Sequence, residues 1–146
     1  MKKNSISRLL ATGILLVAAM FSGAAMAAEK FADKATVEIK GLPGGGKPIY
    51  ILEKTGEDKG GSGIYRLRTQ YNNYLTVMKA DAGTPVGWTS QGEKGSEWIL
   101  FKNSSGWSII AKANGANTVS LIEGNKLALQ RNQGAKHQVW NIVLVK

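Results

Sequence analysis

The stretch from Thr84 to Lys102, TPVGWTSQGEKGSEWILFK, decides the fold of this chain. It predicts an apolar strand, a turn that holds two glycines and a lysine, and a second strand that begins with a tryptophan. The same order occurs from Leu127 to Val145, where Trp140 begins the last strand, and from Pro48 to Leu67, where Tyr65 takes the aromatic position. Three uses of one unit predict an architecture of three degenerate repeats.

Short runs of β-branched and aromatic residues, separated by turn residues, make up the chain on both sides of this stretch. Helical periodicity is almost absent. The candidate strands are Ala35–Lys40, Ile49–Glu53, Ile64–Thr69, Tyr74–Met78, Val86–Thr89, Trp98–Lys102, Trp107–Ala111, Thr118–Ile122, Lys126–Gln130 and Val139–Val145. Many short strands between turns predict an all-β fold, either a barrel or a sandwich.

The N-terminus has the pattern of a secretory signal peptide. Two lysines and an arginine precede an apolar run from Leu9 to Phe21, and the small residues of Ala25–Ala27 follow it. This run is short for a membrane-spanning helix, which takes about 20 residues. We therefore expect residues 1–27 to be cleaved and the protein to be exported, to the periplasm or the medium. Residues 28–146 are then expected to form one domain without a transmembrane segment, and the signal resembles bacterial ones.

Composition excludes several kinds of site. The chain has no cysteine, so disulfides and cysteine-ligated metals are excluded. The formal charge of +9 falls by three to +6 when the three cations of the signal peptide are removed. The other basic residues are scattered singly, which does not predict a specific nucleic-acid site. A solvated basic surface is the simpler interpretation, and binding to an anionic polymer is the alternative.

No arrangement of residues predicts catalysis, a metal or a cofactor. His137 is the single histidine, and a metal site would need further histidine or cysteine ligands. No spacing groups it with a serine and an acid as a hydrolytic triad requires. Glu93 and Glu97 could pair as in glycosidases, but they flank a turn where a solvated surface is expected. The run Gly44–Lys47 leads into a strand, so it is interpreted as a loop and not as a phosphate site.

The closing strands of the three units carry a family resemblance. The last unit contains Gln138-Val139-Trp140, the middle one Ser96-Glu97-Trp98, and the first one Gly63-Ile64-Tyr65. With the strands and glycine-containing links before them, they resemble the repeats of ricin-type β-trefoil lectins, which close on Gln-x-Trp. The resemblance implies a β-trefoil in which one aromatic residue of each repeat packs in a common core and the glutamine hydrogen-bonds turn backbone. Another small β-barrel or a sandwich is the alternative.

The same resemblance implies where a sugar would bind. Each site of the family needs a carboxylate after the leucine-led strand position, an aromatic platform, and an amide near Gln-x-Trp. Only one of the three carboxylate positions is acidic in this chain, which argues against standard galactose-type binding. The positions are Glu38, Thr76 and Ser120 for the carboxylate, Trp88 and Tyr50 for the platform (either could equally be core), and Gln91, Asn132 and Gln133 for the amide.

The sequence therefore predicts an exported, non-catalytic binding module whose partner is a glycan or cell-surface carbohydrate. A second hypothesis is an inhibitor or interaction protein that binds a partner enzyme or a host protein through its loops, of which Leu42–Gly46 is one. A third is adhesion to an anionic polymer through the basic C-terminal third.

Overall fold

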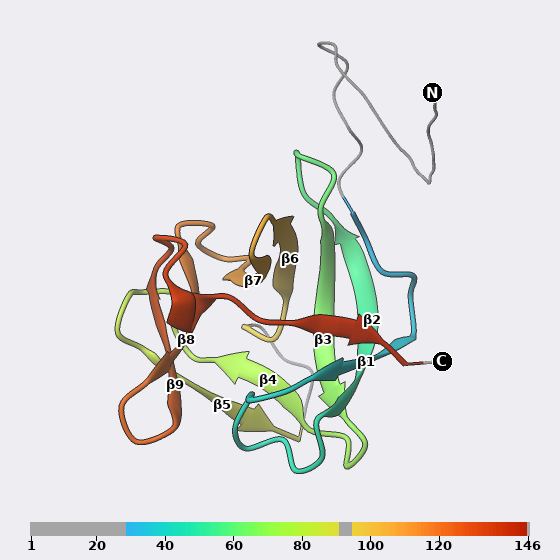
Figure 1. The fold of residues 1–146 in the computed structure, drawn as a ribbon, viewed down its shortest axis with the longest axis horizontal. Helices are drawn as coiled ribbons and strands as arrows, with labels where there is room; N and C mark the ends of the chain where they lie inside the picture. The colour runs from blue at the N-terminus through green and yellow to red at the C-terminus, as the bar shows by residue number, and fades with distance from the viewer. Residues whose placement is uncertain (1–28, 91–94, 146) are drawn as a thin grey trace.

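The computed structural model describes residues 29–90 and 95–145. Within these residues the chain forms ten β-strands and one 3-10 helix, and it forms no α-helix (Figure 1). The elements are β1 Ala35–Ile39, β2 Ile49–Glu57, β3 Gly63–Thr69, β4 Tyr74–Val77, β5 Pro85–Thr89, β6 Trp98–Asn103, β7 Gly106–Ala111, β8 Asn117–Ile122, β9 Lys126–Arg131, η1 Lys136–Gln138 and β10 Ile142–Leu144. The predicted all-β fold is confirmed, and each predicted strand has a counterpart.

The strand ends match the prediction to within one residue except in two places. β2 continues to Glu57, where it pairs with the start of β3. The predicted strand Val139–Val145 is the larger difference, because β10 starts only at Ile142. Trp140 does not lie in that strand; its backbone instead forms an isolated bridge to Trp107, with both N–H···O distances at 2.8 Å. The chain thus pairs first with β7 and only then with β1.

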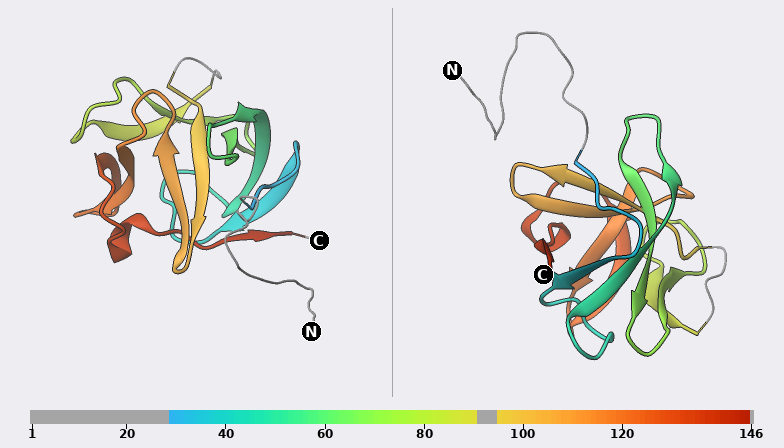
Figure 2. Two further views of the ribbon diagram at one scale, coloured as in Figure 1. Left: turned by 90° about the horizontal axis from the view of Figure 1, so that it is seen from above. Right: turned by 90° about the vertical axis from the view of Figure 1, so that its right-hand side faces the viewer.

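The strands pair as one antiparallel sheet that closes on itself. The order is β10-β1-β2-β3-β4-β5-β9-β8-β7-β6, and β6 also pairs with β3. These pairings make a ring of seven strands from β3 to β6, and β2, β1 and β10 continue outward from β3. Figure 2 shows the β6–β7 hairpin beside β3 when the ring is seen from above. Because each strand of the ring has two neighbours, the ring has no free edge.

The predicted closing aromatic residues are all buried, with exposed fractions of 0% for Tyr65, 0% for Trp98 and 6% for Trp140. The two tryptophans make matching hydrogen bonds. Trp98 Nε1 donates to the carbonyl of Leu75 on β4 at 2.8 Å, and Trp140 Nε1 donates to the carbonyl of Val119 on β8 at 3.1 Å. Each bond satisfies a buried N–H and ties a closing segment to the strand that precedes it by one hairpin.

Tyr65 departs from this arrangement because it bonds to the segment before β1. Its hydroxyl donates to the carbonyl of Phe31 at 2.6 Å and accepts from the Phe31 N–H at 2.8 Å. The Phe31 ring lies 4.7 Å from the ring of Trp107, which is itself in the core. The segment before β1 is therefore part of the packed domain.

We predict that Trp98→Ala lowers the free energy of unfolding by about 3–5 kcal/mol, because it removes a fully buried ring and orphans the Leu75 carbonyl. The measurement is the urea midpoint of unfolding. Phe101→Ala is the control, since Phe101 lies on the same strand but is 46% exposed; it should cost less than about 1 kcal/mol. Equal losses in the two variants would contradict the core assignment.

Candidate functional site

The predicted sugar-site residues do not come together in one place. Gln91 lies outside the described residues. Glu38 is half-buried on β1, between Ile49 of β2 and Val143 of β10. Trp88 lies at the end of β5, and the remaining amide candidates lie in the loop after β9.

Tyr50 belongs to the core and is not a platform for a ligand. Its side chain is 1% exposed, its hydroxyl donates to the carbonyl of Leu42 at 3.4 Å, and burial raises its pKa. Its ring stacks on that of Trp88, with centroids 5.5 Å apart and planes inclined by 10°. The sequence left open whether Tyr50 is an aromatic platform or a core residue, and the structure shows that it is a core residue.

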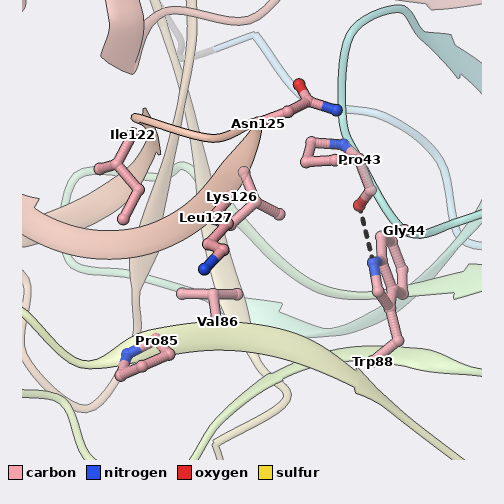
Figure 3. Close-up of a pocket in the computed structure, with 9 residues that line it drawn as sticks. All are labelled: Pro43, Gly44, Pro85, Val86, Trp88, Ile122, Asn125, Lys126 and Leu127. Atoms are coloured by element: carbon pink, nitrogen blue, oxygen red, sulfur yellow. Dashed lines mark hydrogen bonds between the residues drawn. The ribbon is translucent and has the colours of Figure 1, made fainter.

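Trp88 is half-buried and forms part of a pocket wall. Its Nε1 donates to the carbonyl of Pro43 at 2.9 Å, which leaves the indole without a free donor. The pocket has a volume of about 340 Å³ and lies between β5, the tip of the β8–β9 hairpin and the loop before β2 (Figure 3). We call it the apolar pocket; its lining residues are Pro43, Gly44, Pro85, Val86, Trp88, Ile122, Asn125, Lys126 and Leu127.

Thr76 and Ser120 occupy the two expected carboxylate positions that are not acidic in this chain. Both residues are buried, and their hydroxyls form hydrogen bonds within the protein. Thr76 is 5% exposed, and its Oγ1 donates to the carbonyl of Tyr74 and lies 2.9 Å from Thr89 Oγ1. Ser120 is fully buried and accepts a hydrogen bond from Gln138 Nε2 at 3.2 Å. Neither hydroxyl takes the place of a sugar-binding carboxylate.

Gln138 of the Gln-x-Trp motif organises the loop that follows β9. Its side chain is 2% exposed, and its Oε1 accepts from the backbone N–H groups of Gln133 at 2.9 Å and Ala135 at 3.2 Å. Besides its bond to Ser120, its Nε2 donates to the carbonyl of Arg131 at 2.9 Å. The predicted role of this glutamine, to hydrogen-bond turn backbone, is confirmed.

An open hollow of about 580 Å³ lies over Gln138. We call it the polar hollow; it is lined by Ala82, Gly83, Gln130, Arg131, Gln133, His137 and Gln138. His137 Nε2 lies 2.9 Å from Gln130 Oε1, so these two side chains are hydrogen-bonded to each other. Of the predicted amides, Gln133 lines the hollow and Asn132 does not. Asn132 Oδ1 instead accepts from the N–H of Gly134 at 3.2 Å.

Sequence reasoning missed Gln130, Arg131 and His137 as site residues. The predicted strand ends at Gln130, Arg131 belongs to the scattered basic residues, and His137 is considered only for a metal site or a triad. The only signal in the sequence was their closeness to the Gln-x-Trp motif. Two residues of β9 and one of η1 lie close together because the Gln138 side chain is hydrogen-bonded to the backbone at the end of β9.

Glu97 lies in an ion-pair cluster that does not suit acid catalysis. It accepts hydrogen bonds from Thr55 Oγ1 at 2.8 Å and Lys112 Nζ at 3.2 Å, and Arg66 lies 3.8 Å away. Burial raises the pKa of Glu97, but these hydrogen bonds and charges outweigh it, so the net pKa is lowered. A general acid needs the opposite shift.

In residues 29–90 and 95–145 no cluster of three or more histidine, aspartate or glutamate side chains is arranged to hold a metal ion. In the same residues no helix has the length and apolar character needed to cross a membrane.

Comparison with known proteins shows the fold. The structure is similar to the Rhizoctonia solani agglutinin, with a TM-score of 0.63 and 12% identity over 79% of this chain and 98% of that one. It is similar to the BEL β-trefoil, with a TM-score of 0.56 and 11% identity over 80% and 97% of the two chains. The fold is therefore similar to the β-trefoil.

A third neighbour is a Polyporus squamosus lectin bound to the epitope Neu5Acα2-6Galβ1-4GlcNAc, with a TM-score of 0.52 and 17% identity. The match covers 82% of this chain and 50% of that lectin. No family model matches the sequence, and no curated protein matches it. The likeness to β-trefoil lectins is therefore one of structure, at identities that carry the fold alone.

We predict that Gln138→Leu lowers the free energy of unfolding by about 2–4 kcal/mol, because it leaves the buried polar partners of the glutamine unpaired. Hydrogen exchange should also accelerate at the Gln133 and Ala135 amides, which would lose their acceptor. The control is Gln133→Ala, which removes an exposed side chain and should leave both measurements unchanged. Unchanged exchange in Gln138→Leu would show that the glutamine does not hold the loop.

The lowered pKa of Glu97 predicts an acid-sensitive contribution to stability. The contribution is present above the unfolded-state pKa and is lost as the pH falls through the lower folded-state pKa. Glu97→Gln should therefore destabilise the protein by about 0.5–1 kcal/mol near pH 7 and have a smaller effect near pH 2, as measured by urea unfolding. Glu123→Gln, at an exposed residue, should have no effect at either pH. An effect of Glu97→Gln that does not change with pH would contradict this explanation.

Proposed function

We propose that this protein is an exported, non-catalytic, carbohydrate-binding module with the three-repeat architecture of a β-trefoil lectin. The lectins among the structural neighbours support the carbohydrate class. The matching indole bonds of Trp98 and Trp140 support two equivalent repeats, and Tyr65 marks the divergent first one. The signal-peptide pattern in residues 1–27 supports export.

The observation that carries the proposal is the polar hollow, whose base is the hydrogen-bonded side chain of Gln138. Gln138 is held by four hydrogen bonds, so the loop above it is preorganised. Preorganised polar groups lose little entropy when they bind a ligand. The exposed amides, guanidinium and imidazole around Gln138 offer both donors and acceptors, which suits a molecule that is covered with hydroxyl groups.

The hollow differs from the galactose-type sites of the ricin-type lectins. None of its lining residues is acidic, and Arg131 supplies donors only. We therefore propose that sugar oxygens accept hydrogen bonds from Arg131 and that a sugar hydroxyl donates to Nδ1 of His137, whose Nε2 is paired with Gln130 Oε1. Gln130 and Gln133 complete the contacts. The ligand is a glycan bound mainly through its oxygens, and the absence of lining acid is compatible with an acidic sugar.

A glycan array probed at about 0.15 M and about 0.5 M salt tests the function. Binding to defined sugars that survives the higher salt is expected, because direct hydrogen bonds are screened less than loose charge attraction. Salt-abolished binding without sugar preference would instead favour adhesion to an anionic polymer. Absence of sugar binding together with capture of one protein would favour the inhibitor hypothesis.

Variants locate the site once an array has given a sugar. His137→Ala and Arg131→Gln should each weaken binding about tenfold by calorimetry, because each removes hydrogen bonds to the ligand. The matched control is Asn141→Ala, which removes an exposed amide that lines a different cavity and should leave affinity unchanged. Sugar binding that survives both hollow variants would move the site elsewhere on the molecule.

A further inference from the structure

The apolar pocket lies away from the polar hollow, at the opposite end of β9. The hollow uses Gln130 and Arg131 from the end of this strand, whereas the pocket uses Lys126 and Leu127 from its start. Its volume of about 340 Å³ falls at the small end of the range of about 300–1,000 Å³ that is typical of small-molecule sites.

The walls of the pocket are suited to an apolar body and not to a sugar. Six of the nine lining residues are glycine, proline or aliphatic, and the seventh, Trp88, already donates its only N–H to Pro43. A sugar hydroxyl held against these walls would lose water without gaining a partner, at about 1–3 kcal/mol per group. Rings and alkyl groups have no hydrogen bonds to water that they would lose in the same place, and the burial of their apolar surface is favourable.

The aromatic wall is fixed before any ligand arrives. Trp88 stacks on the buried Tyr50 on one face and is held at its edge by the hydrogen bond to Pro43. Gly44 lies so close that a Cβ there would be 2.7 Å from Trp88 Nε1, and its φ of +86° also favours glycine. A wall held from three sides keeps its shape, which lowers the entropic cost of binding.

One cation stands at the pocket without a counter-charge. Lys126 forms no ion pair with any residue of the described part of the chain, and none of the lining residues is acidic. Figure 3 shows the Lys126 ammonium among the lining side chains near Val86, whereas the Asn125 amide lies apart from it. An ammonium without an ion-pair partner thus borders an apolar cavity.

We propose that the apolar pocket binds a small monoanion with an apolar body, of the class of aromatic carboxylates. The ring packs against Trp88, Val86 and Leu127. The carboxylate pairs with the Lys126 ammonium. A charge-assisted hydrogen bond is roughly twice as strong as a neutral one, so the charge of the ligand decides its affinity. This site does not depend on the proposed carbohydrate function.

The test is a calorimetric titration of the protein with 2-naphthoate and, separately, with the neutral isostere 2-naphthamide. We expect saturable binding of one naphthoate per chain, and about tenfold weaker binding of the amide. Amide chemical shifts recorded by NMR during the titration should change around Val86, Trp88 and Leu127.

Three variants isolate the charge. Lys126→Gln should weaken naphthoate binding about tenfold and leave naphthamide binding unchanged. Lys59→Gln removes the same charge from an exposed turn and should change neither. Ile122 is the cross-strand partner of Lys126, so Ile122→Glu places a competing carboxylate beside the ammonium and should abolish naphthoate binding.

Any of three results would overturn the proposal. The first is the absence of saturable naphthoate binding. The second is equal affinity for naphthoate and naphthamide, or equal losses in Lys126→Gln and Lys59→Gln, because the Lys126 charge would then not be the determinant. The third is a set of shift changes that avoids the apolar pocket. None of these results bears on glycan binding in the polar hollow.

Discussion

The architecture depends on two buried indole N–H groups that each find a strand carbonyl. Trp98 donates to Leu75 on β4, and Trp140 donates to Val119 on β8. A buried N–H without a partner is costly, so each tryptophan can occupy the core in one orientation only. That orientation aligns each closing segment with the hairpin before it. A cysteine-free chain of this size has no covalent crosslink to do this work.

Gln138 extends the same logic from the core to the surface. It lies two residues before Trp140, and its buried amide holds the backbone of the loop after β9. The Gln-x-Trp motif is therefore a structural device, with one residue for the core and one for the loop. The polar hollow is its consequence, since the loop would not otherwise bring His137 to Gln130.

The loop before β2 shows how close packing shapes the other cavity. Its carbonyls at Leu42 and Pro43 accept hydrogen bonds from Tyr50 and Trp88. A Cβ at Gly45 would lie 2.6 Å from the Tyr50 hydroxyl, so a larger residue there would push the loop off the aromatic pair. The segment that the sequence predicts as a loop is packed against two rings. It forms one wall of the apolar pocket.

The sequence by itself determined the strands, their order and the burial of the closing aromatic residues, because alternation and turn residues are local signals. The resemblance of Gln-x-Trp to the closing motif of ricin-type β-trefoil repeats also implied the role of Gln138. Only the tertiary structure decided the place of Tyr50 and Trp88, since stacking joins residues of β2 and β5 that no spacing relates. It also decided that the hydroxyls of Thr76 and Ser120 form hydrogen bonds within the protein. Likewise, only the tertiary structure places Lys126 at an apolar cavity without a counter-charge. Sites are made where distant segments meet, and such meetings depend on packing that periodicity does not record.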